Sequence, residues 1–152
     1  MPIGLLQGCS LEAERADRVA MGLDGLRAAL SESYHAHIVA VTEEIRQCGR
    51  LLRDLLTRTQ MHVQRVPLTL NYLQIILPCL SRSLRDITNF YEDKAYSREL
   101  RWRKMYHEMS KEASGLSLYQ RFMLYNTFLS MLLQLLTRYA CYRIRGKSRC
   151  LQ

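Results

Sequence analysis

The chain contains little glycine and proline, with seven and three residues respectively among 152. Folds made of many short strands, such as β-sandwiches, need these residues at their frequent turns. Their scarcity argues against such a fold. Hydrophobic residues make up 48% of the chain, which is too much for a disordered protein. A single domain of this length can bury enough surface to fold without a disulfide or a metal.

The sequence also lacks the motifs of common catalytic and cofactor sites. It contains no G-x-S-x-G, P-loop, G-x-G-x-x-G or H-E-x-x-H motif. Its five cysteines are far apart, and none forms a C-x-x-C pair or a zinc-type spacing with histidine. His35 and His37 would lie about 200° apart around a helix, so one ion could not bind both. We therefore expect no catalytic, cofactor or metal site, and a protein that is not an enzyme.

Features of export and lipid attachment are missing from the N-terminal residues MPIGLLQGCSLEAE. They include no basic stretch, and their apolar run is too short for a signal peptide. Glycine stands at position 4 instead of position 2, which excludes the N-myristoylation motif. Widely spaced cysteines, odd in number, are typical of reduced thiols. These observations predict an intracellular, cytoplasmic protein.

Positive charge is concentrated at the C-terminal end. The net charge is +8, and five positive residues lie in the last fifteen positions: Arg138, Arg143, Arg145, Lys147 and Arg149. Without them the rest of the chain carries only +3. This segment could contact an anionic membrane surface, be a solvated end, or result from an error in gene prediction. Nucleic acid is not the expected partner, because the remainder of the chain is nearly balanced.

Apolar residues repeat at intervals of four and three along three segments. The pattern runs from Ala16 to Leu30, from Tyr34 to Thr59 and from Leu118 to Tyr139. Such spacing keeps one apolar stripe on one face of a helix, and its period of 3.5 is typical of helices that cross at shallow angles. The sequence therefore predicts an all-α fold, a helical bundle of four to five helices with up-down packing.

Caps and breakers indicate where the helices lie. We expect helices over 11–30, 32–62, 69–91, 95–113 and 117–139, with Ser10 and Ser31 as N-caps and Gly115 as a C-terminal stop. Pro78 should kink or split the third helix. The first two helices could also form one continuous helix. The predicted organisation is an N-terminal tail at 1–10, a bundle domain at 11–138 and a basic C-terminal tail at 139–152.

The fifth predicted helix has an unusual surplus of apolar surface. Residues 122–137 carry no charge, but this run is shorter than a membrane span requires, and Asn126, Ser130 and Gln134 form a polar stripe along it. We therefore expect a helix that is buried or shared with a partner. A second apolar row lies beside the main stripe and is a candidate partner-binding surface, which predicts self-association: Leu124, Phe128, Met131 and Leu135.

The fourth predicted helix interleaves basic and aromatic residues. Arg101, Arg103 and Lys104 flank Trp102 and would form a basic face. Such a face can bind an anionic or protein partner, although nearby glutamates partly neutralise it. These three residues are the second candidate partner-binding group.

Three stretches resemble a family of helical proteins from filamentous fungi: LPCLSRSLRD at 77–86, RWRKMYHEM at 101–109 and RFMLYNTFLSMLLQLLTR at 121–138. The resemblance covers roughly residues 25–138 and implies a helical module without an assigned catalytic residue. A weaker similarity, in architecture alone, is to N-terminal helical domains of fungal multidomain receptors. The sequence as a whole predicts a module for protein–protein interaction or assembly, which binds a protein partner or itself. The alternative is a peripheral membrane protein whose basic tail binds anionic lipid.

Overall fold

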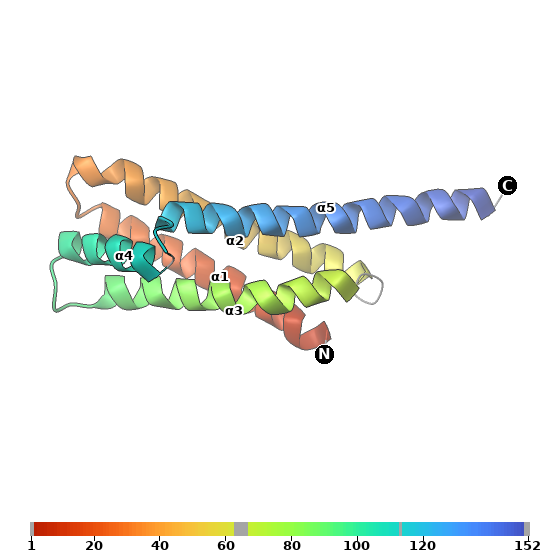
Figure 1. The fold of residues 1–152 in the computed structure, drawn as a ribbon, viewed down its shortest axis with the longest axis horizontal. Helices are drawn as coiled ribbons and strands as arrows, with labels where there is room; N and C mark the ends of the chain where they lie inside the picture. The colour runs from red at the N-terminus through yellow and green to blue at the C-terminus, as the bar shows by residue number, and fades with distance from the viewer. Residues whose placement is uncertain (1, 63–66, 113, 151–152) are drawn as a thin grey trace.

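The computed structural model describes residues 2–62, 67–112 and 114–150, and the side-chain surroundings within 4–58, 69–112 and 114–138. Five helices contain most of these residues: α1 (Pro2–Arg27), α2 (Glu32–His62), α3 (Pro67–Glu92), α4 (Arg98–Glu112) and α5 (Leu118–Cys150) (Figure 1). The described ranges contain no strand. The predicted all-α helical bundle is confirmed.

A short turn separates α1 from α2, so they are not one continuous helix. The N–H groups of Ala29 and Leu30 donate to carbonyls three residues earlier, and these tight bonds end α1. Ser31 stands directly before α2, at the predicted cap position, and its carbonyl accepts from the Tyr34 N–H at 3.0 Å. Its hydroxyl lies 3.0 Å from the Ser33 hydroxyl. The two helices then pack side by side in opposite directions (Figure 1).

The predicted N-terminal tail at 1–10 is wrong, because α1 begins at Pro2. Ser10 lies inside the helix and does not cap it. The physical reason is that the 4-3 repeat continues back through Cys9 to Leu5, with Glu12 at the position between Cys9 and Ala16. Cys9 is buried, and Leu5 packs against the core. These contacts hold the first turns in place where an exposed tail was expected.

The predicted boundary between residues 138 and 139 falls inside a helix. α5 continues to Cys150 and projects past the end of the other helices (Figure 1). The side chains of Tyr139 and of the basic residues after it lie outside the described surroundings, as does Thr59 in α2.

Pro78 does not split α3, which runs unbroken from Pro67 to Glu92. Proline removes the N–H that would bond the carbonyl of residue 74 and crowds that carbonyl. Both Pro78 and Gln74 are exposed, so water can solvate the freed carbonyl. The interruption is tolerated because it lies on the solvent side of the helix.

The four long helices form a ring in the order α3, α1, α2, α5. α1 packs on both α2 and α3, α2 packs on α5, and α4 lies against α3 at one end (Figure 1). Long helices that follow one another in the sequence run in opposite directions, while the ring neighbours α1 and α3, and likewise α2 and α5, run in the same direction (Figure 1). The predicted 4-3 stripes face the interior. Their buried members include Val19, Leu23, Ile38, Ile45, Leu52, Phe122, Leu129 and Leu136.

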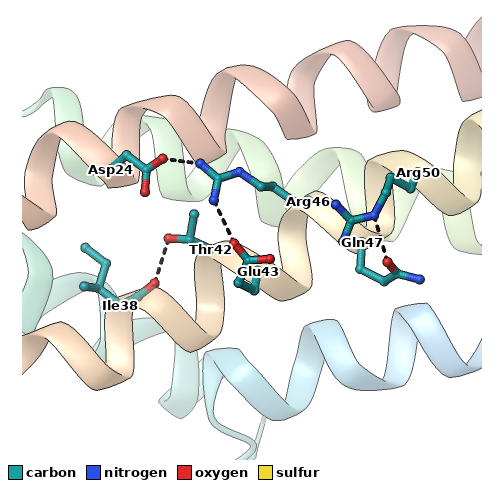
Figure 2. Close-up of polar contacts among 7 residues, drawn as sticks. All are labelled: Asp24, Ile38, Thr42, Glu43, Arg46, Gln47 and Arg50. Atoms are coloured by element: carbon teal, nitrogen blue, oxygen red, sulfur yellow. Dashed lines mark hydrogen bonds and ion pairs between the residues drawn. The ribbon is translucent and has the colours of Figure 1, made fainter.

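Small residues and ion pairs define the α1–α2 seam. Gly49 is buried in α2, and a methyl group there would lie 3.6 Å from the Ala16 side chain in α1. The same methyl group would lie 3.5 Å from the Ala13 carbonyl oxygen, so the α1 backbone lies close to α2 at this point. At the rim, Arg46 bridges Asp24 in α1 and Glu43 in its own helix (Figure 2).

The turn between α4 and α5 is built from local backbone and side-chain bonds. Gly115 has a φ of 92°, and its N–H donates to the Ser110 carbonyl at 2.9 Å. This confirms the predicted C-terminal stop, since glycine adopts positive φ without strain. Ser117 and Gln120 then exchange side-chain-to-backbone bonds at 3.2 and 3.0 Å. This capping box starts α5.

Candidate protein-interaction surface

The α3–α5 seam is the most loosely packed side of the ring. Long side chains span the α3–α5 seam, whereas small residues line the α1–α2 seam. The rings of Tyr72 and Phe128 meet edge to face with centroids 5.4 Å apart. Further along, the hydroxyls of Ser83 and Tyr125 lie 2.9 Å apart. Large side chains at a seam keep helix axes apart, which leaves the flanks of α3 and α5 accessible.

Large apolar side chains are exposed on these two flanks. The exposed fractions are 66% for Ile75, 61% for Met131 and 56% for Leu124. Ile75 lies three residues after Tyr72, while Leu124 and Met131 lie four before and three after Phe128. Residues three or four apart are neighbours on a helix surface, so all three lie beside the Tyr72–Phe128 contact. These five residues together are named here the α3–α5 face.

The predicted apolar row on α5 lies on this face, but it is not uniformly exposed. Leu124 and Met131 project to solvent, whereas Phe128 and Leu135 are half-buried against the core. The row therefore forms the border between core and surface.

A buried amide sets the rotation of α5. The Asn126 side chain is 6% exposed and donates to the Glu44 carbonyl at 2.8 Å and to the Glu44 carboxylate at 2.7 Å. Asn126 therefore points toward α2. Leu124 is two residues earlier and projects from another side of the helix, since two residues correspond to about 200°. The polar anchor on one side thus helps to present the apolar row on the other.

Two residues of the predicted basic face hold the α3–α4 connection. Arg101 donates from Nε to the Tyr96 carbonyl at 2.9 Å and from Nη1 to the Tyr91 carbonyl at 3.3 Å. The Lys104 ammonium lies 3.8 Å from the centre of the Tyr96 ring, a cation–π contact. Both cations therefore have structural roles within the chain.

Arg103, the third residue of that face, reaches across to α2. It donates to the Tyr34 hydroxyl, lies over the Tyr34 ring at 5.2 Å and pairs with Glu99 at 3.2 Å. Among the described residues, no hydrogen bond or ring contact joins Arg101, Arg103 or Lys104 to the apolar row of α5. The structure therefore does not bring the two predicted groups into one site.

Arg103 also lines an aromatic pocket of about 370 Å³ between α2 and α4. Trp102 and Tyr106 form part of its wall with ring centroids 5.7 Å apart, and His37 meets Tyr106 at 6.2 Å. His107 also lines it. Such a pocket suits a flat apolar group, although Trp102 itself is 2% exposed and belongs mainly to the core.

Buried thiols lie elsewhere in the core. Burial raises the pKa of Cys9 to about 11. Burial, with the nearby charges of Glu12 and Glu44, raises the pKa of Cys48 to about 12. Both remain protonated at neutral pH, and a protonated thiol is a poor nucleophile. Burial also raises the pKa of Tyr125, while the Ser83 hydrogen bond and the Arg121 charge oppose the rise.

The candidate anionic-surface residues are only partly described. Arg138 is exposed near the end of the described side chains, while the side chains of Arg143, Arg145, Lys147 and Arg149 lie outside them. Within the described part of the chain, none of the helices has the length and apolar character needed to cross a bilayer. The same residues contain no group of three or more histidine, cysteine or acidic side chains that could hold a metal ion.

The sequence alone did not identify the α3 half of this surface. Tyr72 and Ile75 lie off the main apolar stripe of α3, and only the position of α5 shows that they adjoin Leu124 and Met131. The uncharged character of both segments, 67–81 and 122–137, was the available signal. Comparisons with protein-family models, with curated proteins and with solved structures find no match to this chain.

Proposed function

We propose that this protein is a non-catalytic assembly module that associates with a second copy of itself through the α3–α5 face. The observation that carries this proposal is the exposure of Ile75, Leu124 and Met131 together beside the loosest seam of the bundle. Contiguous apolar patches on a surface are typical of association sites. An intracellular, cytoplasmic setting is part of the proposal, because reducing compartments keep cysteines such as Cys9, Cys48 and Cys79 free.

The size of the face sets what a dimer requires. The uncharged stretches of α3 and α5, residues 67–81 and 122–137, are about 23 Å long, and two adjacent helices present a width of about 20 Å. The product is about 450 Å², roughly half of what each partner contributes to a standard interface, so a stable dimer through this face also uses the residues around it.

Charge favours a second copy as the occupant. The net charge of +8 is concentrated in the last fifteen residues, so an association that brought two of these ends together would be repulsive. The α3–α5 face avoids this cost, because residues 67–81 and 122–137 carry no charge. In a twofold-symmetric dimer the α3–α5 faces of two copies would meet, and these uncharged surfaces would place no like charges opposite each other.

Sedimentation velocity over a range of protein concentrations tests the proposal. The natural chain should form a dimer, and Met131→Glu should shift it to monomer, because each interface would then contain buried carboxylates. Met21→Glu is the matched control, since Met21 is 72% exposed on α1 and lies outside the face. A monomeric natural chain, or equal effects of the two substitutions, would contradict the proposal.

The alternative function is attachment to anionic membranes through the C-terminal part of α5. The projection of α5 supports it, because the C-terminal end of this helix extends past the other described helices (Figure 1). Flotation with vesicles of phosphatidylcholine and phosphatidylserine compares the full chain with one lacking residues 139–152. Equal flotation of the two forms would reject this alternative.

A further inference from the structure

A second site lies on the α1–α3 seam, away from the α3–α5 face. A cavity of about 270 Å³ opens there, and arginines from both helices line it. The residues that matter for its chemistry are Arg15, Arg18, Arg85, Asn89, Tyr91 and Glu92.

Hydrogen bonds to Glu12 and Ser81 fix the position of the Arg15 side chain. Its Nη1 donates to the Glu12 carboxylate at 2.8 Å and to the Ser81 hydroxyl at 2.7 Å. Glu12 is 5% exposed, so this ion pair is largely shielded from water. Among the described contacts, the bonds of Arg15 are all made by Nη1. Its Nε and Nη2 therefore remain for a ligand, on a side chain that is already fixed.

Arg18 and Arg85 face the same cavity from α1 and α3. Both are exposed, and neither forms an ion pair within the described residues. Glu92 lines the cavity as well, but it is not within pairing distance of these arginines. Since Glu12 neutralises Arg15 and Glu92 offsets one more charge, the cavity keeps a surplus of one positive charge.

Tyr91 closes one side of the cavity because residue 22 is glycine. A methyl group at Gly22 would lie 2.6 Å from Cζ of Tyr91. The ring therefore rests directly against the α1 backbone, in space that any side chain would fill. It offers an apolar surface next to the guanidinium groups.

We infer that this cavity binds a phosphate-bearing small molecule, with Arg18 and Arg85 contacting the phosphate and Arg15 as a preorganised third donor. Guanidinium groups match phosphate oxygens with paired N–H donors, and Asn89 adds a neutral amide. The cavity is larger than a phosphate group, so an organic remainder can lie beside Tyr91. The phosphate could belong to a soluble ester or to a lipid headgroup.

Titration calorimetry with the full chain tests this inference, with phenyl phosphate and pyrophosphate as soluble probes. Arg18→Gln and Arg85→Gln should each weaken binding by about tenfold or more, because each removes a charged donor. Arg50→Gln is the matched control, since it removes the same charge from an exposed position on α2. Circular dichroism verifies that each variant is folded.

Vesicles distinguish the two sources of phosphate. Flotation with phosphatidylcholine vesicles that contain phosphatidic acid should depend on Arg18 and Arg85 if the ligand is a lipid headgroup. Arginine-dependent binding to soluble probes alone indicates a soluble ester. Binding that Arg18→Gln and Arg85→Gln leave unchanged, or no binding to either source, would overturn the inference. Gly22→Ala adds a second check, since displacing Tyr91 should weaken phenyl phosphate more than pyrophosphate.

Discussion

Asn126 of α5 donates two hydrogen bonds to Glu44 of α2, a residue 82 positions earlier in the chain. One bond goes to the backbone carbonyl and the other to the carboxylate. The Asn126 amide therefore contacts both the backbone and the charged group of Glu44. Its own Oδ1 is buried without a hydrogen-bond partner, so only the donor half of the amide stabilises the contact.

This contact predicts an unusual ranking of substitutions at Asn126. Asn126→Asp keeps the shape but places a second carboxylate beside Glu44, and we expect it to cost about 3 kcal/mol or more. Asn126→Leu removes the unpartnered oxygen along with the donor and should cost less. Urea denaturation followed by circular dichroism measures both. If the aspartate variant is the more stable of the two, the amide is not the anchor described above.

Two glycines of α1 should respond in opposite ways to alanine. No atom lies within 4 Å of a methyl group placed at Gly25, so Gly25→Ala should stabilise the protein by up to about 1 kcal/mol through helix propensity. Gly22→Ala would displace the Tyr91 ring and should destabilise by about 1–3 kcal/mol. In a Tyr91→Ala background the same Gly22 change should become favourable. Thermal unfolding of the natural chain, the two single variants and the double variant completes this cycle of Gly22 and Tyr91. If Gly22→Ala still destabilises the protein in the Tyr91→Ala background, the prediction is wrong.

The cysteines should differ sharply in reactivity. Cys79 is exposed, whereas Cys9 and Cys48 are buried. Iodoacetamide should therefore label Cys79 in the folded protein and reach the other two only after unfolding, which peptide mass spectrometry can follow. Labelling in concentrated urea is the control, and there Cys9, Cys48 and Cys79 should react to a similar extent. Rapid labelling of Cys48 in the folded protein would show that the core opens.

The buried thiols also predict a loss of stability in alkali. Their pKa values, about 11 for Cys9 and about 12 for Cys48, exceed the ordinary 9.0, so the folded state keeps protons that the unfolded state releases. The resulting stability is complete below pH 9.0 and declines as the pH rises through these values. Cys48→Ala should show a shallower decline in unfolding free energy between neutral pH and about pH 10.5. If the unfolding free energy of the natural chain and of Cys48→Ala declines equally with pH, the Cys48 thiol is not a source of this pH dependence.

Arg121 should hold α4 onto the bundle. Its guanidinium donates to the Met109 carbonyl near the end of α4 and to the Ser83 hydroxyl of α3. We expect Arg121→Met to cost about 1–3 kcal/mol, because the last carbonyls of α4 lose a charged donor. The emission of Trp102, the single tryptophan, reports release of α4, since the ring is buried there. Arg50→Met is the control and should change stability by no more than about 0.5 kcal/mol.

Local patterns in the sequence were enough to predict most of the helices. The stripe that begins at Tyr34 and the one that begins at Leu118 are long, so their faces were correctly assigned as buried. The start of α1 was missed because the charged residue Glu12 interrupts the apolar stripe, although Cys9 and Leu5 continue its 4-3 spacing. Pro78 was expected to interrupt α3, but its exposure could not be known before the helix was placed.

The candidate sites were harder to predict, because they depend on pairs that are distant in sequence. Leu124 and Met131 were identified from α5 alone, but their neighbour Ile75 comes from α3. The arginine cavity joins Arg18 to Arg85, and neither lies in a recognisable motif. Helical periodicity indicates which face of a segment is buried and gives no information on which segments meet.

The ring order also bears on how the chain reaches its native state. Among the four long helices described, the α1–α2 seam joins neighbours in sequence. The α1–α3 and α2–α5 seams depend on contacts between distant residues, such as Arg15–Ser81 and Glu44–Asn126, which are 66 and 82 positions apart. Closing a short loop costs less chain entropy than closing a long one. We therefore expect the α1–α2 hairpin to form first and α5 to dock last. The apolar flank of α5 would then stay uncovered longest during synthesis, which makes this helix the segment most in need of chaperone protection.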